Sequence, residues 1–146
     1  MTPEFSPREQ VVEVVNRLFF FTDSRAWEAL QQQVFADEVV LDMTSLGAEA
    51  ATTVSAQQIC DLWEEGFRGL DAVHHHGSNY LIDIHDDRAD VVAYAIATHF
   101  KAAATQGKVR TFVGSYDLQL ARLERGWRIT SFRYNLKYMD GNVELK

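Results

Sequence analysis

The chain has 146 residues, of which 47% are hydrophobic and 24% charged, the composition of an ordinary globular protein with one core. Its net charge of -7 and the absence of a dense basic cluster exclude nucleic acids and anionic membranes as expected partners. Cys60 is the only cysteine, so no intrachain disulfide or thiolate metal cage can form, and a reducing cytoplasm is the expected compartment. Neither "MTPEFSPREQ" nor "LFFF" predicts a signal peptide or a membrane span. We expect a single domain, 1–146.

The first half of the chain is predicted to be helical. The segment "SPRE" supplies Ser6 as N-cap, Pro7 at the first helical position and Glu9 to complete a capping box. The segment "TDSRAWEALQQQ" predicts a second helix that starts after Asp23 or Ser24. The apolar residues between these two points form one broad helical face: Val11, Val12, Val14, Val15, Leu18 and Phe19.

A short strand, a loop and a third helix are expected next. The segment "EVVLDM" has the pattern of a strand, and residues 47–54, "GAEAATTV", are expected to form a loop. Ser55 and Gln58 form a second capping box, which opens a helix. The inward face of this helix is predicted to hold Ile59, Leu62, Trp63 and Phe67.

From residue 73 onward the hydrophobic period changes to two, which predicts strands. Four long strands are expected at about 74–85, 89–103, 108–124 and 127–138, joined by the short polar turns "HDDR", "TQGK" and "ERG". Such a meander is antiparallel, and three helices covering one of its faces give an α+β fold. A strongly curved sheet against helices encloses a pocket, and pockets of this kind bind small apolar ligands.

Several segments, taken in this order, resemble a known superfamily. They are "FTDSRAWEAL", "FADEVVLDM", "HHHGSNYLIDIHDDRADVVAYAIATHF" and "GSYDLQLARLERGWRI", and together they span most of the chain. The chain resembles the nuclear-transport-factor-2-like superfamily, and within it the SnoaL-like branch, which includes scytalone dehydratase, hexachlorocyclohexane dehydrochlorinase and related cyclases and isomerases. The resemblance implies a cone-shaped α+β fold.

The resemblance also implies a set of site residues. In the dehydratase and the dehydrochlorinase an aspartate at the start of the second helix pairs with a histidine that opens the first long strand. Asp23 matches the aspartate, and the "HHGSN" pattern selects His75. His99 lies near the position of the dehydratase's second pocket histidine, and Ser115 and Asp117 lie where that enzyme has a serine and an asparagine.

Two departures separate this chain from a true scytalone dehydratase. The two tyrosines that hold water in that enzyme correspond to Thr22 and Met43 here, and its asparagine corresponds to Asp117. The expected base is therefore retained while the electrophilic side of the site differs. The residues expected to bind substrate are Phe20, Met43, Trp63, Ser115 and Asp117.

The pairing of Asp23 with His75 has a chemical purpose. A neutral imidazole can accept a proton near neutral pH, and a carboxylate on its other nitrogen fixes the tautomer and stabilises the imidazolium. Asp23 could instead simply cap a helix. Strand alternation points His75 one way and its two histidine neighbours the other, although a shift of one residue would turn His74 and His76 inward instead. No spacing typical of a metal site occurs, so neither metal nor cofactor is expected.

The sequence supports more than one function. The leading hypothesis is a cofactor-free enzyme in which His75 removes a proton from an apolar carbonyl or aromatic, polyketide-like compound, giving dehydration, isomerisation or cyclisation. The alternative is a non-catalytic binding or scaffold module, such as the small subunit of ring-hydroxylating dioxygenases. Epoxide hydrolysis would need a carboxylate-rich water site that the sequence does not offer. The resemblance also implies an apolar outer sheet face, for which Tyr116, Phe132 and Tyr134 alternate suitably, and hence a homo-oligomer, most simply a dimer.

Overall fold

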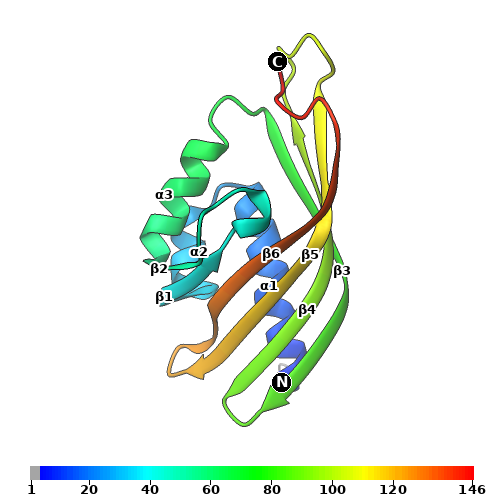
Figure 1. Cartoon of the computed structure of the whole chain (residues 1–146). Coiled ribbons are helices and arrows are strands. Elements are labelled where there is room, and N and C mark those ends of the chain that lie inside the picture. The colour runs from blue at the N-terminus through cyan, green and yellow to red at the C-terminus, as the bar shows by residue number, and fades with distance from the viewer. Residues whose placement is uncertain (1–3) are drawn as a thin grey trace.

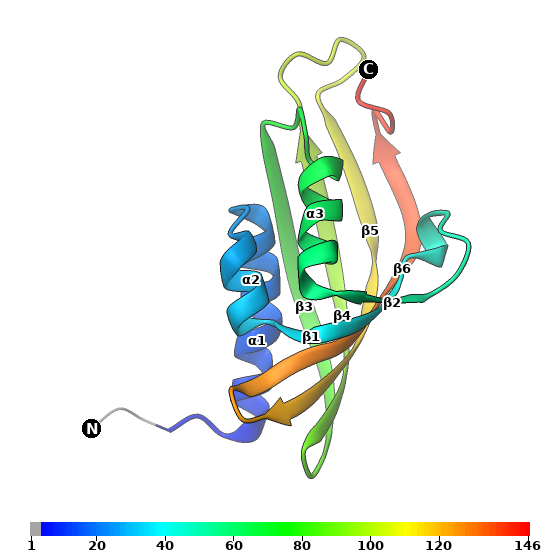
Figure 2. The same ribbon diagram turned by 90° about the vertical axis from the view of Figure 1, so that its left-hand side faces the viewer.

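A computed structural model describes residues 4–146 of the chain. Three α-helices lie on one side of a curved six-stranded sheet that does not close into a barrel (Figures 1 and 2). The α+β cone fold expected from the sequence is confirmed. The elements in chain order are α1 Pro7–Asp23, α2 Trp27–Gln33, β1 Phe35–Asp42, a 3-10 turn Thr44–Leu46, β2 Thr52–Ser55, α3 Ala56–Gly66, β3 Ala72–His85, β4 Arg88–Phe100, β5 Val109–Leu123 and β6 Gly126–Gly141.

Both predicted capping boxes begin helices. The Ser6 side chain accepts from the Glu9 backbone N–H and the Glu9 carboxylate accepts from the Ser6 N–H, and Ser55 and Gln58 do the same for α3. The second helix, however, starts at Trp27 and not directly after Asp23 or Ser24. Asp23 is the last residue of α1. The backbone turns at Arg25, which has a left-handed conformation (φ 57°), before the chain becomes helical again.

The inward face of α3 is narrower than the sequence suggested. Ala56, Ile59 and Cys60 are buried and Trp63 packs against the core, which is the i, i+3, i+4, i+7 stripe of an amphipathic helix. Leu62 lies to the side of this stripe and is 58% exposed, so its predicted inward position is wrong.

The strand order in the sheet is β2-β1-β6-β5-β4-β3. Neighbouring strands are antiparallel except β1 and β6, which run parallel, with Leu41 opposite Phe132. The antiparallel meander expected for the four long strands is confirmed, and the one parallel pairing, to β1, makes the whole sheet mixed. The loop expected at residues 47–54 is corrected, because residues 52–55 form β2 and pair with β1 at the sheet edge.

Three register shifts lie within the meander of long strands and bend it. They lie between Ser78 and Leu81 in β3 and at two points in the β5–β6 pairing, between Val113 and Gly114 and between Gln119 and Leu120. Bulges of this kind increase local twist and curvature. The concave face that results packs against α1 and α3 and holds the core, whose largest fully buried side chains include Leu18, Leu30, Phe35, Ile59, Leu118, Leu120 and Ile129.

The apolar outer face of the sheet consists of other residues than predicted. Tyr116, Phe132 and Tyr134 are buried on the concave side, so their predicted outward position is wrong. The outer face instead exposes apolar side chains of β4: Val92, Tyr94 and Ile96. Within residues 4–146, none of the helices has the length and apolarity needed to span a membrane.

Candidate active site

An aspartate at the end of α1 contacts a histidine of β3. Asp23 ends α1 and His75 lies in β3, and the His75 Nδ1 is 2.6 Å from the Asp23 Oδ1. The second carboxylate oxygen, Oδ2, accepts the His75 backbone N–H at 2.8 Å. The two side chains are only 19% and 10% exposed. One carboxylate therefore fixes both the backbone and the ring of His75.

This contact sets the tautomer of His75. A carboxylate can only accept, so the Nδ1 of a neutral His75 carries the hydrogen and Nε2 keeps its lone pair. The imidazole lies against the cavity described below and stacks on the Phe19 ring, with centroids 5.6 Å apart and planes 13° from parallel. The next residue on the same face of β3 is Gly77, where a Cβ would collide with the Phe19 ring. The glycine of "HHHGSN" thus permits the stacking that orients the base.

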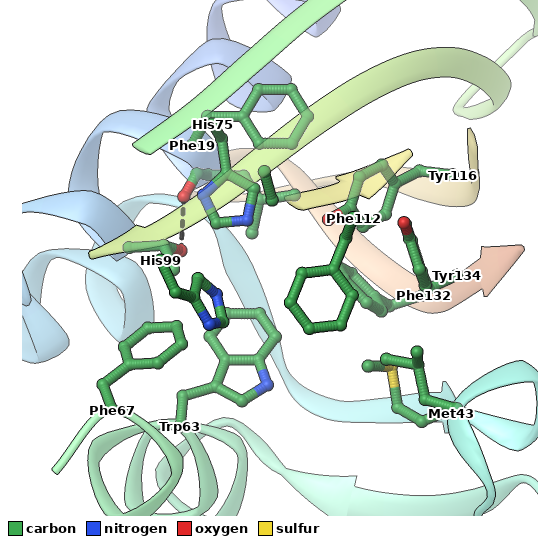
Figure 3. A pocket seen from close by; sticks show the side chains of 14 residues that line it. Phe19, Met43, Trp63, Phe67, His75, His99, Phe112, Tyr116, Phe132 and Tyr134 are labelled. Atoms are coloured by element: carbon green, nitrogen blue, oxygen red, sulfur yellow. Dashed lines mark hydrogen bonds between the residues drawn. The ribbon is translucent and has the colours of Figure 1, made fainter. Parts of the chain in front are cut away.

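A cavity of about 160 Å³ lies between the helices and the concave face of the sheet. Figure 3 shows that its wall is mainly aromatic, with two histidines from neighbouring strands. The side chains that line it are Leu18, Phe19, Thr22, Met43, Leu46, Trp63, Phe67, His75, Ala97, His99, Phe112, Tyr116, Phe132 and Tyr134. Such a wall suits a small apolar ligand with few polar groups.

The second histidine of the cavity has the opposite tautomer. His99 is 8% exposed, and its Nδ1 accepts a hydrogen bond of 3.0 Å from the Arg110 Nε. Because Nδ1 must keep its lone pair to accept, a neutral His99 carries its hydrogen on Nε2 and is a donor there. Burial, together with the positive charge of Arg110, lowers the pKa of His99 from 6.5 to about 4. His99 is therefore a neutral hydrogen-bond donor, whereas the Nε2 of His75 is an acceptor.

Because the pKa of His99 is lowered, the free energy of unfolding depends on pH. Between about pH 6.5 and pH 4 the unfolded chain protonates His99 and the folded chain does not, so the free energy of unfolding must fall as the pH falls through this window. In His99→Gln the amide oxygen can still accept from Arg110, but the side chain does not titrate. Between pH 7 and pH 4.5 the free energy of unfolding of the wild type should therefore fall by roughly 2–3 kcal/mol more than that of His99→Gln. Urea unfolding at both pH values measures this difference, with His74→Gln as a control for an exposed histidine. Equal losses in the wild type and His99→Gln would contradict the assignment.

Two of the five residues expected to bind substrate lie at the cavity. Met43 and Trp63 line it. Phe20 does not, because it is 75% exposed on the outer side of α1. Ser115 and Asp117 point to the outer face of β5, where both interact with the Asn135 side-chain amide. Because successive side chains of a strand point to opposite faces, Ser115 and Asp117 do not line the cavity.

The residues that alternate with this pair face the cavity, which was not predicted from the sequence. Tyr116 lies between Ser115 and Asp117 and faces the cavity, as Phe112 does four positions earlier. The period-two pattern contained the signal, since a strand cannot place Ser115 and Tyr116 on the same face. The exposed histidines on either side of His75, His74 and His76, lie beside a separate hollow behind the pair. Across residues 4–146, no three His, Cys, Asp or Glu side chains are grouped as metal ligands.

Comparison with known proteins agrees with this architecture. The profile of the SnoaL-like domain matches residues 3–133. The structure of Kfla4162 from Kribbella flavida is similar at a TM-score of 0.90 and 26% identity, covering 95% of each chain. A proposed scytalone dehydratase from Novosphingobium aromaticivorans has a TM-score of 0.78 and 14% identity, with coverage of 91% of this chain and 85% of the other.

A third similar structure is a type-3 hexachlorocyclohexane dehydrochlorinase from Novosphingobium barchaimii. Its TM-score is 0.76 at 13% identity, and the match covers 93% of this chain and 90% of the other. The search among curated protein sequences found no significant match. The likeness to the two enzymes shows a common fold, and the match of the domain profile over most of the chain confirms the resemblance inferred from the sequence. The chain belongs to the SnoaL-like domain family.

Proposed function

We propose that the protein is a cofactor-free enzyme in which His75 removes a proton from a small apolar carbonyl or aromatic compound. The observation that carries this proposal is the 2.6 Å contact between His75 Nδ1 and Asp23 Oδ1 at the wall of a nearly apolar cavity. The contact leaves the Nε2 lone pair as the proton acceptor, and the carboxylate stabilises the imidazolium that forms.

The chemical step needs no other reagent. The C–H bond next to a carbonyl breaks, its proton moves to the His75 Nε2, and the electron pair forms a carbon–carbon double bond as the carbonyl oxygen becomes negative. Loss of a leaving group from the next carbon completes an elimination, and return of the proton to another carbon completes an isomerisation. Attack of the new nucleophilic carbon on a second carbonyl would be a cyclisation.

Among these outcomes we favour elimination. Two structural neighbours are named for eliminations, a dehydratase and a dehydrochlorinase. The neutral His99 supports the same choice, because its Nε2–H can donate to the oxygen or halogen that leaves. Its lowered pKa keeps this donor uncharged over the physiological range, so it does not compete with His75 for the proton.

The volume of the cavity limits the substrate. A closed protein cavity of about 150 Å³ binds benzene, and this cavity measures about 160 Å³. We therefore propose a substrate of about one ring with a carbonyl group, held by the aromatic wall. Larger polyketides would extend through the opening of the cavity.

Exchange of carbon-bound protons tests the proposal without knowledge of the final product. Acetophenone, 1-indanone and 2-cyclohexenone would be incubated with the protein in D2O, and loss of the proton signal next to the carbonyl would be followed by NMR. We expect exchange above the buffer rate for at least the ligands that raise the melting temperature. Ligands that bind without any exchange would instead indicate a binding or scaffold module.

Assembly and compartment are also proposed here. Exposed Val92, Tyr94 and Ile96 on β4 favour a homo-oligomer, most simply a dimer joined through the outer sheet face. Light scattering at micromolar concentration should give twice the monomer mass, and a monomer would contradict this. The single cysteine, which is free and buried, favours the cytoplasm.

A further inference from the structure

Tyr116 is held firmly at the cavity wall. Its side chain is 6% exposed, and its ring contacts three other rings, with centroids 5.6 Å from Phe19, 5.2 Å from Phe132 and 4.9 Å from Tyr134. Phe19 is the same ring that stacks on His75. The orientation of Tyr116 is therefore coupled by packing to the orientation of the expected base.

The register of the sheet places Tyr116 two rows from His75 on the concave face. On the concave face, the row that contains His75 also contains Ala97 and Phe112, while Tyr116 pairs with Ala93 on one side and Tyr134 on the other. The row between them contains Gly77, Ala95 and Gly114, with Leu136 opposite Gly114 on β6. These small residues make room for the Phe19 ring over Gly77 and for the Tyr134 hydroxyl over Gly114. Figure 3 shows the Tyr116 ring and the imidazole at the same cavity.

The Tyr116 hydroxyl has no hydrogen-bond partner within residues 4–146, although the residue is almost fully buried. The hydroxyl of Tyr134 also has no partner among the described residues, but it is fully buried against Gly114, where a ligand cannot reach it. Burial raises the pKa of Tyr116 far above its ordinary value of 10, and the charge of Asp23 raises it further. Tyr116 therefore keeps its proton and is a donor within electrostatic range of the Asp23–His75 pair.

The positions that would hold donors in a scytalone dehydratase do not hold free donors here. Thr22 lines the cavity, but its hydroxyl already donates to the Leu18 carbonyl at 2.6 Å, and Met43 has no donor. A reaction that builds negative charge on a carbonyl oxygen needs a donor aimed at that oxygen. In the described chain the unpartnered hydroxyl of Tyr116 can meet this need.

We propose that the Tyr116 hydroxyl binds the substrate oxygen that becomes negative when His75 removes the proton. The substrate is then a one-ring compound whose carbonyl oxygen reaches Tyr116 while its acidic C–H lies at the His75 Nε2. This assignment rests on the proposed function. Tyr116 keeps its own proton throughout and acts only by donating a hydrogen bond.

The test uses two probes of similar shape. 4-Nitrophenol can give its proton to His75 and bind as a phenolate that mimics the enolate, and its absorption spectrum reports the ionised form. 4-Nitroanisole has the same ring and nitro group, is larger by one methyl group, and has no acidic proton. Both would be titrated into the wild type, into Tyr116→Phe, which keeps the ring and its packing, and into Tyr80→Phe. The Tyr80 hydroxyl bonds to Asn16 away from the cavity, so Tyr80→Phe is a matched control.

We expect Tyr116→Phe to bind the 4-nitrophenolate form about 10- to 100-fold more weakly than the wild type, because a hydrogen bond to a charged oxygen is lost. Affinity for 4-nitroanisole should change less than about twofold in the same variant, and Tyr80→Phe should bind both probes as the wild type does. A folded Tyr116→Phe that binds 4-nitrophenolate with wild-type affinity would overturn the proposal. So would a wild type that binds neither probe.

Titration of 4-nitrophenol into His75→Ala separates this proposal from the proposed function. If the bound probe stays ionised without His75, another group takes its proton and the role of His75 as base fails. The loss of affinity in Tyr116→Phe would then still support Tyr116 as the site of a negative oxygen. If ionisation is lost in His75→Ala while Tyr116→Phe keeps full affinity, the base is supported and the role of Tyr116 fails.

Discussion

Replacing Asp23 with asparagine is expected to lower the rate of proton exchange by about 10³–10⁴, the cost known for carboxylate–histidine pairs. The side-chain oxygen of asparagine can still accept the His75 backbone N–H, so β3 should keep its place against α1. The amide NH2 then faces the ring, and Nδ1 must accept instead of donate. His75 would carry its hydrogen on Nε2, and the lone pair needed for the proton would be lost.

Two measurements check this expectation. Nitrogen-15 NMR of the histidine rings should show His75 changing tautomer in Asp23→Asn while His99 keeps its own, and the exchange assay should show the loss of rate. Asp71→Asn is the matched control, because the Asp71 carboxylate bonds to the Ala102 backbone N–H and does not touch a histidine. Full activity in Asp23→Asn, or an unchanged His75 tautomer, would show that the pair does not act as a base.

Removal of the imidazole itself should have an effect of similar size. His75→Ala is expected to reduce proton exchange by about 10²–10⁴, the usual contribution of a positioned base. The variant leaves space beside Phe19 and Asp23, so imidazole added to the buffer can enter and accept the proton. We expect exogenous imidazole to restore part of the rate in a concentration-dependent way.

The stability of His75→Ala is checked separately. The backbone N–H of residue 75 still reaches the Asp23 carboxylate, so thermal unfolding should remain cooperative. Rescue by imidazole would not follow if the histidine had only a packing role. Activity that survives the substitution without imidazole would place the base elsewhere in the cavity.

Local signals made much of the fold predictable. Each capping box joins residues three apart, and two hairpins have short polar turns, at 86–87 and 124–125, so neither depends on distant parts of the chain. The third connection was predicted less well: the strand expected at 89–103 ends at Phe100, and residues 101–108 form a longer loop than "TQGK". Strand alternation likewise placed His75 alone among the three adjacent histidines at the cavity. Here the sequence pattern and the structure agree because the interaction is decided within a few residues.

Contacts between distant segments were not predictable in this way. The parallel pairing of β1 with β6 and the short β2 depend on which strand edge is free after the whole sheet has formed. The face of β5 was also ambiguous, because Tyr116 is equally suited to an exposed apolar surface and to a cavity wall, while Ser115 matched the family pattern. Only the position of the helices decides which face is covered.

The parallel pairing of β1 with β6 determines when the cavity can appear during folding. It joins segments at opposite ends of the chain, such as Phe35 opposite Ile129, and residues of β6 also supply part of the cavity wall. Closing so long a loop loses chain entropy before any contact compensates for it, and proteins rich in such contacts fold in milliseconds to seconds, not microseconds. The aromatic wall therefore stays exposed to water until residues 126–141 have joined the sheet. During that interval these side chains can associate with other chains, which makes slow refolding at low protein concentration the favourable condition for recovering the native protein.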